Sequence, residues 1–191
     1  MKVYLIRHAQ SVENALGLAH HVNQTQFNAF IHETVQAPLS SIGLLQTRRT
    51  VRQLRDKGIE HLYTSPFARA RCTADVLGRA LKLAPEMMPD LGEIMPAHMP
   101  ESKHITSVRL HYLRGYLLLA VPGSQPENWL ALYHRAQRAW RTISQGGGNS
   151  VAVVSHYAFI HSLLPNAILQ WRGRLHRYDL RNSGVTCLEI H

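Results

Sequence analysis

An arginine and a histidine stand side by side near the start of the chain, where a buried strand is expected to end. Arg7 and His8 follow the apolar run 3–6, and Ser11 and Asn14 come next as the chain turns toward a helix. At the carboxyl end of a strand in an α/β sheet, such side chains face the crevice where these folds bind ligands. The backbone N–H groups that open the helix point to the same place and suit an anion. This pattern indicates chemistry on a phosphoryl group.

A second histidine repeats this layout far along the chain. The apolar run 151–154 predicts a fully buried strand, and Ser155, His156 and Tyr157 follow it directly before an apolar helix. Right-handed crossovers between parallel strands would bring both strand ends to one edge of the sheet. His156 therefore gives the strongest internal support for a site at that edge.

A further arginine is expected in the first turn of a helix. Ser65 should cap that helix and Pro66 should occupy its first position, which places Arg69 one turn inside. A positive side chain beside the positive end of a helix is unfavourable unless an anion is present. Such a local conflict is typical of a functional site.

Together these stretches resemble the signatures of the histidine phosphatase superfamily, the phosphoglycerate mutase-like proteins. Residues 7–14 are similar to its Arg-His-Gly-x-Thr-x-x-Asn signature, with Ala9 and Ser11 in place of Gly and Thr. Residues 65–74 match Ser-Pro-x-x-Arg-Ala-x-x-Thr-Ala position for position. Residues 38–46 match Pro-Leu-Ser-x-x-Gly-x-x-Gln. Residues 153–158 resemble Val-x-Ser/Thr-His-Gly-Gly, with Tyr157 and Ala158 in place of the glycines, so the resemblance extends over nearly the whole chain.

The resemblance implies catalytic roles for four of these side chains. His8 would attack the phosphorus in line and carry the phosphoryl group as phosphohistidine, a task that suits imidazole. Arg7 and Arg69 would bind the equatorial oxygens with their planar guanidinium groups. His156 would donate a further hydrogen bond to the same group.

Further binding and proton-transfer roles follow from the same resemblance. Residues 91–93 are similar to the family's Leu-x-Glu, which assigns the proton donor to Glu93, with Asp90 as the fallback. Ser11 and Asn14 are expected to bind the substrate or its phosphate. Tyr157, which stands where the family has a glycine, is expected to contact the substrate as well. Neither a cofactor nor a metal ion is implied, because side chains supply the positive charge.

The activity implied by the resemblance is that of an enzyme, a phosphomonoester hydrolase acting on a small phosphorylated metabolite through a phosphohistidine intermediate. A phosphoglycerate mutase-type phosphoryl transfer is the alternative, although the chain is shorter than typical glycolytic members and lacks their middle segments. A non-catalytic module that binds phospholigands is a third hypothesis, and the presence of all the expected catalytic side chains argues against it.

Strands and helices alternate along the chain, which predicts a three-layer α/β/α sandwich with a mostly parallel central sheet, as in phosphoglycerate mutase-like proteins. A length of 191 residues suits one domain, 1–191. Two segments, about 15–38 and 94–125, are expected to be cap or insert segments that decide substrate choice. The first should be a loop with a helical turn, either a lid or a surface excursion, and residues 108–119 should form a helix.

Composition restricts the partners and the location. The formal charge of +9 comes from scattered basic residues without a nucleic-acid motif, so a small phosphorylated substrate explains it as well as a polynucleotide would. No apolar run is long enough to span a membrane. Cys72 and Cys187 have no metal-ligand spacing, and a cytoplasmic protein with reduced cysteines is expected. Two copies could pair as a homodimer through a strand edge or through the helix at 108–119.

Overall fold

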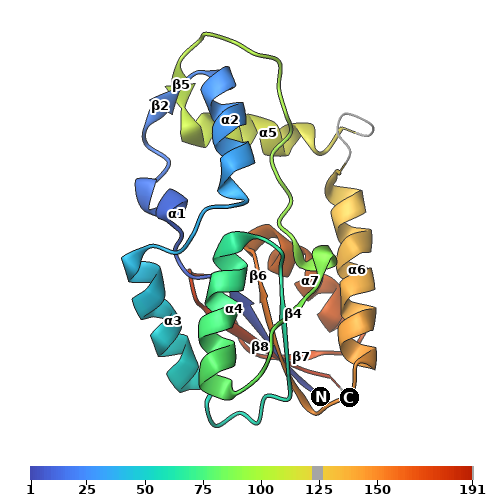
Figure 1. Cartoon of the computed structure of the whole chain (residues 1–191). Coiled ribbons are helices and arrows are strands. Elements are labelled where there is room, and N and C mark those ends of the chain that lie inside the picture. The colour runs from blue at the N-terminus through green and yellow to red at the C-terminus, as the bar shows by residue number, and fades with distance from the viewer. Residues whose placement is uncertain (122–126, 191) are drawn as a thin grey trace.

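A six-stranded sheet lies at the centre of the molecule, with strand order β4-β3-β6-β1-β8-β7 (Figure 1). The computed structural model describes residues 1–121 and 127–190 of the chain. Within these ranges β1 pairs in parallel with β6, β6 with β3 and β3 with β4, whereas β8 runs antiparallel to both of its neighbours. The strands are β1 (Lys2–Arg7), β3 (His61–Thr64), β4 (Glu86–Met87), β6 (Ser150–Ser155), β7 (Arg174–Arg177) and β8 (Val185–Glu189).

Helices cover both faces of this sheet, because successive side chains of a strand point to opposite faces. Val3 and Leu5 belong to a core shared with α6 and α7, while Tyr4 and Ile6 belong to a core shared with α3 and α4. The predicted three-layer α/β/α sandwich is therefore confirmed. The four helices are α3 (Ser41–Leu54), α4 (Ala68–Leu81), α6 (Trp129–Gln145) and α7 (Tyr157–Leu169).

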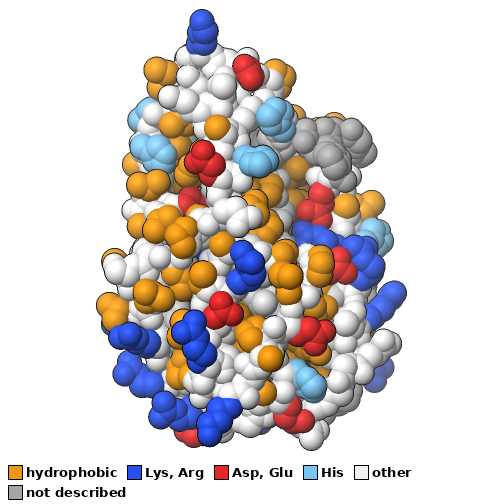
Figure 2. Space-filling model, in the orientation of Figure 1, with side chains coloured by type: hydrophobic (Ala, Val, Ile, Leu, Met, Phe, Trp, Pro, Cys, Tyr) orange, Lys and Arg blue, Asp and Glu red, His pale blue; other side chains and the backbone are white. Residues whose placement is uncertain are grey.

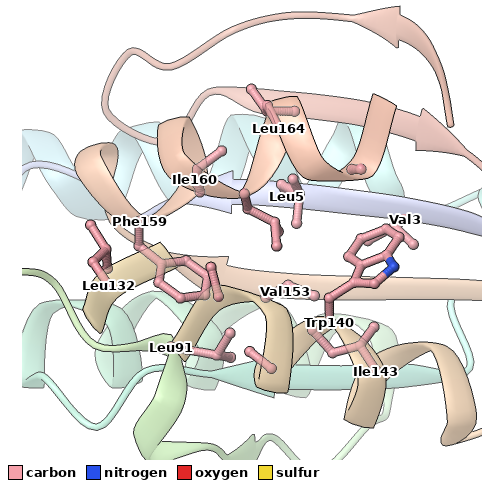
Figure 3. Close-up of a cluster of buried hydrophobic side chains, with 14 of the residues drawn as sticks. Val3, Leu5, Leu91, Leu132, Trp140, Ile143, Val153, Phe159, Ile160 and Leu164 are labelled. Carbon is pink, nitrogen blue, oxygen red and sulfur yellow. The ribbon is translucent and has the colours of Figure 1, made fainter. Parts of the chain in front are cut away.

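The larger core lies between the sheet and the helices α6 and α7 (Figure 3). Trp140 and Phe159 are buried there together with Leu5 and Val153 of the two central strands. Full burial of one such side chain stabilises the fold by about 1.5–3 kcal/mol. This packing fixes the two strand ends from which Arg7, His8 and His156 project.

A smaller unit stands apart from the sandwich and is joined by segments from both halves of the chain (Figure 1). Its two strands pair antiparallel, and its two helices pack on each other. We call residues 17–37 and 98–121 the α2/α5 unit. Its elements are β2 (His21–Val22), α2 (Gln24–Thr34), β5 (Thr106–Ser107) and α5 (Val108–Leu118).

The α2/α5 unit corrects one prediction and confirms another. Residues 24–34 form a helix of 11 residues instead of a loop with a helical turn. Asn23 caps this helix, and the buried ring of Phe27 stacks on His111 at 4.9 Å and meets Tyr112 edge-on at 5.1 Å. Because these contacts come from a distant segment, local periodicity could not reveal the helix. The helix expected at 108–119 is present as α5, whereas residues 122–125 of the second predicted segment lie outside the described residues.

The helix that carries Arg69 begins at Ala68, so the start predicted just after Ser65 is wrong. Phe67 is the N-cap residue, and no side chain caps this helix. The hydroxyl of Ser65 instead accepts a hydrogen bond from the Phe67 N–H and contacts His156 across the sheet. Ser65 therefore belongs to the strand end and not to the helix.

Two short helical segments complete the described fold. They are α1 (Val12–Leu16), which follows the first strand, and the 3₁₀ helix η1 (Pro89–Leu91), which precedes Glu93. No helix in residues 1–121 and 127–190 is both long enough and apolar enough to cross a membrane.

Candidate active site

The two histidines predicted to share a sheet edge lie next to each other. Strands β1 and β6 pair in register up to Arg7 and Ser155, and the His8 N–H donates to the Ser155 carbonyl at 2.8 Å. The ring centroids of His8 and His156 are 5.1 Å apart, and both rings are buried. The parallel pairing of these strands therefore brings together two side chains from opposite ends of the sequence.

The hydrogen bonds of the His8 ring determine its tautomer. Its Nδ1 lies 2.7 Å from the Ala9 carbonyl oxygen, which can only accept, so Nδ1 carries the proton. Its Nε2 then accepts a hydrogen bond from Nε of Arg69 at 3.1 Å. Burial, and after it the charge of Arg69, holds the pKa of His8 well below its usual value. His8 is therefore a neutral imidazole whose unprotonated Nε2 accepts a hydrogen bond from Arg69.

Arg69 is held at the cavity by contacts with α1, with α2 and with the N-cap residue of its own helix. Its Nη1 donates to the Thr34 carbonyl at 2.6 Å and lies 3.9 Å from a carboxylate oxygen of Glu13. Its guanidinium also stands 5.0 Å from the centre of the Phe67 ring. Burial lowers the pKa of Arg69 and the neighbouring Glu13 carboxylate opposes that shift. The guanidinium is thus fixed beside the reactive nitrogen of His8.

Arg7 and His156 each leave one polar atom without a partner. Arg7 donates through Nη1 to the Leu180 carbonyl at 3.0 Å and stands 5.4 Å from the centre of the Tyr157 ring. Among the described side chains, the buried nitrogen and oxygen atoms that lack a hydrogen bond are Arg7 Nε and His156 Nδ1. Leaving a buried donor unpaired costs about 1–3 kcal/mol. The unpaired donor of Arg7 and the unpartnered ring nitrogen of His156 indicate a place beside His8 for a polar, hydrogen-bonding ligand group.

His156 is held by a hydrogen bond with Ser65. The Ser65 hydroxyl oxygen lies 2.7 Å from His156 Nε2 and also accepts from the Phe67 N–H. A hydroxyl oxygen can accept two hydrogen bonds, so this contact is compatible with either neutral tautomer of the ring. Burial lowers the pKa of His156 well below its usual value, so the ring stays neutral. The other ring nitrogen, His156 Nδ1, is buried without a hydrogen-bond partner among the described residues.

The carboxyl group of Glu93 sits at the start of α7. It accepts hydrogen bonds at 3.1 Å from the backbone N–H groups of Ile94, Ala158 and Phe159. Burial raises the pKa of Glu93, and these three hydrogen bonds oppose that shift. A carboxyl group in this setting keeps its proton to a higher pH than a solvated one, as a proton donor requires.

These side chains surround a cavity of about 490 Å³ between the sheet edge and the α2/α5 unit. Six residues predicted from the sequence lie in its wall, namely Arg7, His8, Asn14, Arg69, Glu93 and Tyr157. The other described residues of the wall are Glu13, Leu18, Thr34, Met95, Pro96, Tyr112, Tyr116, Trp129 and Ala158.

Three predicted residues lie outside this wall. Ser11 is buried, and its hydroxyl accepts the Asn14 N–H and caps α1. His156 lies beside His8 and is fully buried. Asp90, the fallback for Glu93, pairs with Arg138 at 3.2 Å. The cavity therefore includes Glu93 and does not include Asp90.

Sequence reasoning missed Glu13 and three aromatic residues of the wall, Tyr112, Tyr116 and Trp129. Glu13 stands between two signature residues in the first turn of α1, so its position was itself a signal. Tyr112 and Tyr116 are four residues apart on α5, a spacing that places them on one face of the helix. Trp129 opens α6, and nothing in its local sequence shows that it reaches the cavity.

No group of three or more histidine, cysteine, aspartate or glutamate side chains in the described part of the chain could hold a metal ion. The positive charge in the cavity wall comes from Arg7 and Arg69. This arrangement can bind a phosphoryl group through guanidinium donors.

The sequence profile of the histidine phosphatase superfamily (branch 1) matches residues 3–191, so the chain belongs to this superfamily. No curated protein sequence matches the chain significantly.

Several solved structures are similar to the whole chain. Phosphoglycerate mutase from Bacillus anthracis superposes with a TM-score of 0.69 at 20% identity, covering 100% of this chain and 91% of that one. A mutant of phosphoserine phosphatase from Entamoeba histolytica, in complex with phosphoserine, gives 0.66 at 20% identity, covering 97% and 89%. A mycobacterial glucosyl-3-phosphoglycerate phosphatase gives 0.65 at 17% identity, covering 100% and 91%. At these identities the likeness establishes a phosphoglycerate mutase-like fold.

Proposed function

We propose that this protein hydrolyses phosphomonoesters of small metabolites through a phosphohistidine formed at His8. One observation carries the proposal: the neutral, buried His8 presents an unprotonated Nε2 beside Arg69, in a cavity that also holds Arg7 and the carboxyl group of Glu93. Membership of the histidine phosphatase superfamily supports the same activity.

In the first step, His8 Nε2 attacks the phosphorus and the ester P–O bond breaks. Nε2 exchanges its hydrogen bond from Arg69 for the new P–N bond, and the guanidinium then donates to the phosphoryl oxygens. Glu93 gives its proton to the departing alcohol oxygen, which leaves as a neutral alcohol. The Nδ1–H bond to the Ala9 carbonyl stabilises the positive charge that develops on the ring.

In the second step, a water molecule takes the place of the alcohol. The Glu93 carboxylate accepts a proton from this water while the water oxygen attacks the phosphorus. The P–N bond breaks, its electron pair returns to Nε2, and inorganic phosphate leaves. Glu93 and His8 regain their starting protonation, so the cycle closes.

Arg7 and His156 complete the binding of the phosphoryl group in this proposal. We propose that the neutral His156 carries its proton on Nδ1, and that Nδ1 and Arg7 Nε, which have no hydrogen-bond partner in the described part of the chain, donate to phosphoryl oxygens bound beside His8. Donors fixed in a buried site stabilise the charge of the transition state without reorganising, and removing one typically costs about 10²–10³ in rate. We propose that Asn14 and Tyr157, which also lie in the wall, help to place the substrate, and that Ser11 contributes by fixing Asn14.

The main competing activity is a mutase reaction, in which a bound product recovers the phosphoryl group from His8. The fold is similar to that of a bacterial phosphoglycerate mutase, which is the observation in favour of this reaction. The two activities differ in their products from 3-phosphoglycerate. Release of inorganic phosphate identifies the hydrolase, and conversion to 2-phosphoglycerate identifies the mutase.

The proposal is tested by phosphate release from a panel of phosphomonoesters in the presence of EDTA, with wild type and His8→Ala side by side. We expect wild-type turnover that survives EDTA, a ³²P label on His8 after rapid acid-free quenching, and neither signal in the variant. A matched variant, His134→Ala, removes an exposed histidine outside the cavity wall and should keep full activity.

A folded wild type that binds phosphate but never releases it from an ester and never labels His8 would instead support a non-catalytic phospholigand-binding module. We further propose a single domain in which residues 15–38 and 94–125 cap the site, a cytoplasmic location and a possible homodimer. Light scattering of the purified protein tests the last of these.

A further inference from the structure

Part of the cavity wall is a continuous aromatic surface. Tyr112 and Tyr116 stack with ring centroids 5.9 Å apart and an interplanar angle of 19°. Tyr116 continues to Trp129 at 5.9 Å, and the Trp129 Nε1–H donates to the Tyr116 carbonyl at 3.2 Å. The Tyr112 hydroxyl donates to Glu13 at 3.2 Å. The polar groups of Trp129 and Tyr112 are therefore already hydrogen-bonded within the protein. What the rings offer to a ligand is mainly their faces.

Apolar side chains extend this aromatic surface. Leu18, which belongs to the α2/α5 unit, and Met95 and Pro96, which precede its second segment, lie in the same wall. Basic side chains gather over the lower left of the molecule, around α3 and α4, and on the right beside α6 (Figure 2). The wall near α5 is therefore suited to an apolar group.

The charges in the described wall leave no cation for a second anionic group. Arg7 and Arg69 are its positive side chains, and Glu13 and Glu93 are its acidic ones. His8 is neutral, because burial and the charge of Arg69 lower its pKa. Residues 122–126, Pro-Gly-Ser-Gln-Pro, contain no ionisable side chain. A phosphoryl dianion therefore uses both arginines.

A substrate that also carried a carboxylate or a second phosphate would place that charge close to Glu13, without a counter-ion. Removing a charge from water without a partner is strongly unfavourable. An uncharged aromatic or apolar group would instead bury its surface on the rings, and aromatic pairs in proteins are stabilising beyond the area they bury.

Building on the proposed hydrolase activity, we infer that the substrates are phosphomonoesters of uncharged alcohols with an aromatic or apolar group that packs on Tyr116 and Trp129. Small polyanionic esters, such as those with a carboxylate next to the ester carbon, are excluded by charge. Tyr116 and Trp129 are therefore residues that determine specificity.

The test compares four alkyl phosphates, so that the departing alcohols have similar reactivity. These are 2-phenylethyl phosphate, ethyl phosphate, phosphoserine and 3-phosphoglycerate. We expect kcat/KM for 2-phenylethyl phosphate to exceed that for ethyl phosphate by about tenfold or more, which corresponds to one stacked ring. Phosphoserine and 3-phosphoglycerate should fall below ethyl phosphate.

Substitutions then show whether the named rings set this ratio. Trp129→Ala and Tyr116→Leu should each reduce the preference for 2-phenylethyl over ethyl phosphate by about three- to tenfold. Leu130→Ala, which removes the exposed side chain next to Trp129, should leave the ratio at its wild-type value. If the ratio of kcat/KM for 2-phenylethyl over ethyl phosphate were equal in wild type and all three variants, Tyr116 and Trp129 would not determine specificity.

A gain of function tests the charge argument independently. Leu18 lies in the wall and is 49% exposed, so Leu18→Lys places a cation there without disturbing the core. We expect it to raise kcat/KM for phosphoserine and 3-phosphoglycerate by about tenfold relative to ethyl phosphate. Leu16→Lys, at an exposed position outside this wall, adds the same charge and should not do so.

The outcomes separate this inference from the proposed activity. If wild type hydrolyses phosphoserine or 3-phosphoglycerate as well as 2-phenylethyl phosphate, the inferred substrate class is wrong and the hydrolase stands. If no ester is hydrolysed and His8 is never labelled, the proposed activity fails. Calorimetry of the same four esters with the wild-type protein then decides the ligand class, and the inference fails unless 2-phenylethyl phosphate binds most tightly.

Discussion

The ends of β1 and β6 provide one part of the cavity wall, and the α2/α5 unit with the start of α6 provides another. The strand-end part holds Arg7 and His8, backed by His156 and fixed by backbone hydrogen bonds within a buried sheet. The other part holds Tyr112 and Tyr116 on α5, which stands apart from the sandwich, and Trp129 at the first residue of α6. The rigid part is suited to chemistry common to every phosphomonoester, and the other part to distinguishing one alcohol from another.

Substitution of Glu93 should give the largest effect on the strand-end part. Glu93→Gln cannot donate a proton, so kcat for alkyl phosphates should fall by about 10²–10⁴. The loss should be much smaller with 4-nitrophenyl phosphate, whose departing group needs no proton. Since burial raises the pKa of Glu93, wild-type activity should decline as the pH rises through that pKa, and this alkaline decline should disappear in the variant.

Rate–pH profiles with both esters check this prediction. A similar loss with 4-nitrophenyl phosphate would mean that Glu93 acts mainly by holding the start of α7 through its three backbone hydrogen bonds.

Arg69→Lys should give the next largest effect. Lysine keeps the charge but has no planar fork, so it cannot donate to both His8 Nε2 and the Thr34 carbonyl as Arg69 does. We expect kcat to fall by about 10²–10³ for every ester alike. Arg71→Lys, at an exposed position on the same helix, is the matched control. A loss that differed strongly between esters would mean that Arg69 also helps to distinguish one alcohol from another, which contradicts the separate roles given to the two parts.

Phe27→Ala tests whether the α2/α5 unit can open on its own. The ring is buried between His111 and Tyr112, and its removal should cost about 3–5 kcal/mol. Hydrogen exchange of α2 and α5 amides should accelerate strongly, while amides of β1 and β6 remain protected. Phe30→Ala, at a half-exposed position on α2, should change exchange much less. Equal acceleration in both regions would show that the two parts unfold together.

The pH dependence of stability should give the smallest effect. His8 and His156 have folded-state pKa values well below 6.5, so below that pH the unfolded chain binds more protons than the folded one. Stability should therefore fall as the pH drops below 6.5, by up to about 1.4 kcal/mol per pH unit for each histidine. Urea unfolding of wild type and His156→Asn at several pH values checks this, since the variant should show a shallower slope. Identical slopes would contradict it.

The sequence predicts the strand-end part of the cavity wall better than the part formed by the α2/α5 unit and the start of α6. The strand ends carry short apolar runs followed at once by polar residues, so the sequence alone is enough to assign Arg7, His8 and His156 to one sheet edge. Glu93 needed the family resemblance, because a single carboxylate after a loop has no local signal. Its three backbone partners come from its neighbour and from the start of α7.

The structure of the α2/α5 unit could not be predicted in this way, because its helices are stabilised by contacts between distant segments of the chain. Helix α2 has no clean apolar period, and it is stabilised by an Asn23 cap and by packing of Phe27 against α5. The connection of Arg69 to the Thr34 carbonyl is likewise invisible in the sequence, since it joins a signature residue to a backbone atom. These contacts explain why substrate selection was harder to predict than chemistry.

The in-register pairing of β1 with β6 also has a consequence for how the protein reaches its active form. These strands are neighbours in the sheet although most of the chain separates them, and such non-local parallel pairing is slow to form. His8 and His156 therefore meet only when this late pairing closes. Recovery of turnover during refolding should lag behind recovery of helical circular dichroism. The rate at which activity returns therefore measures the last stage of folding.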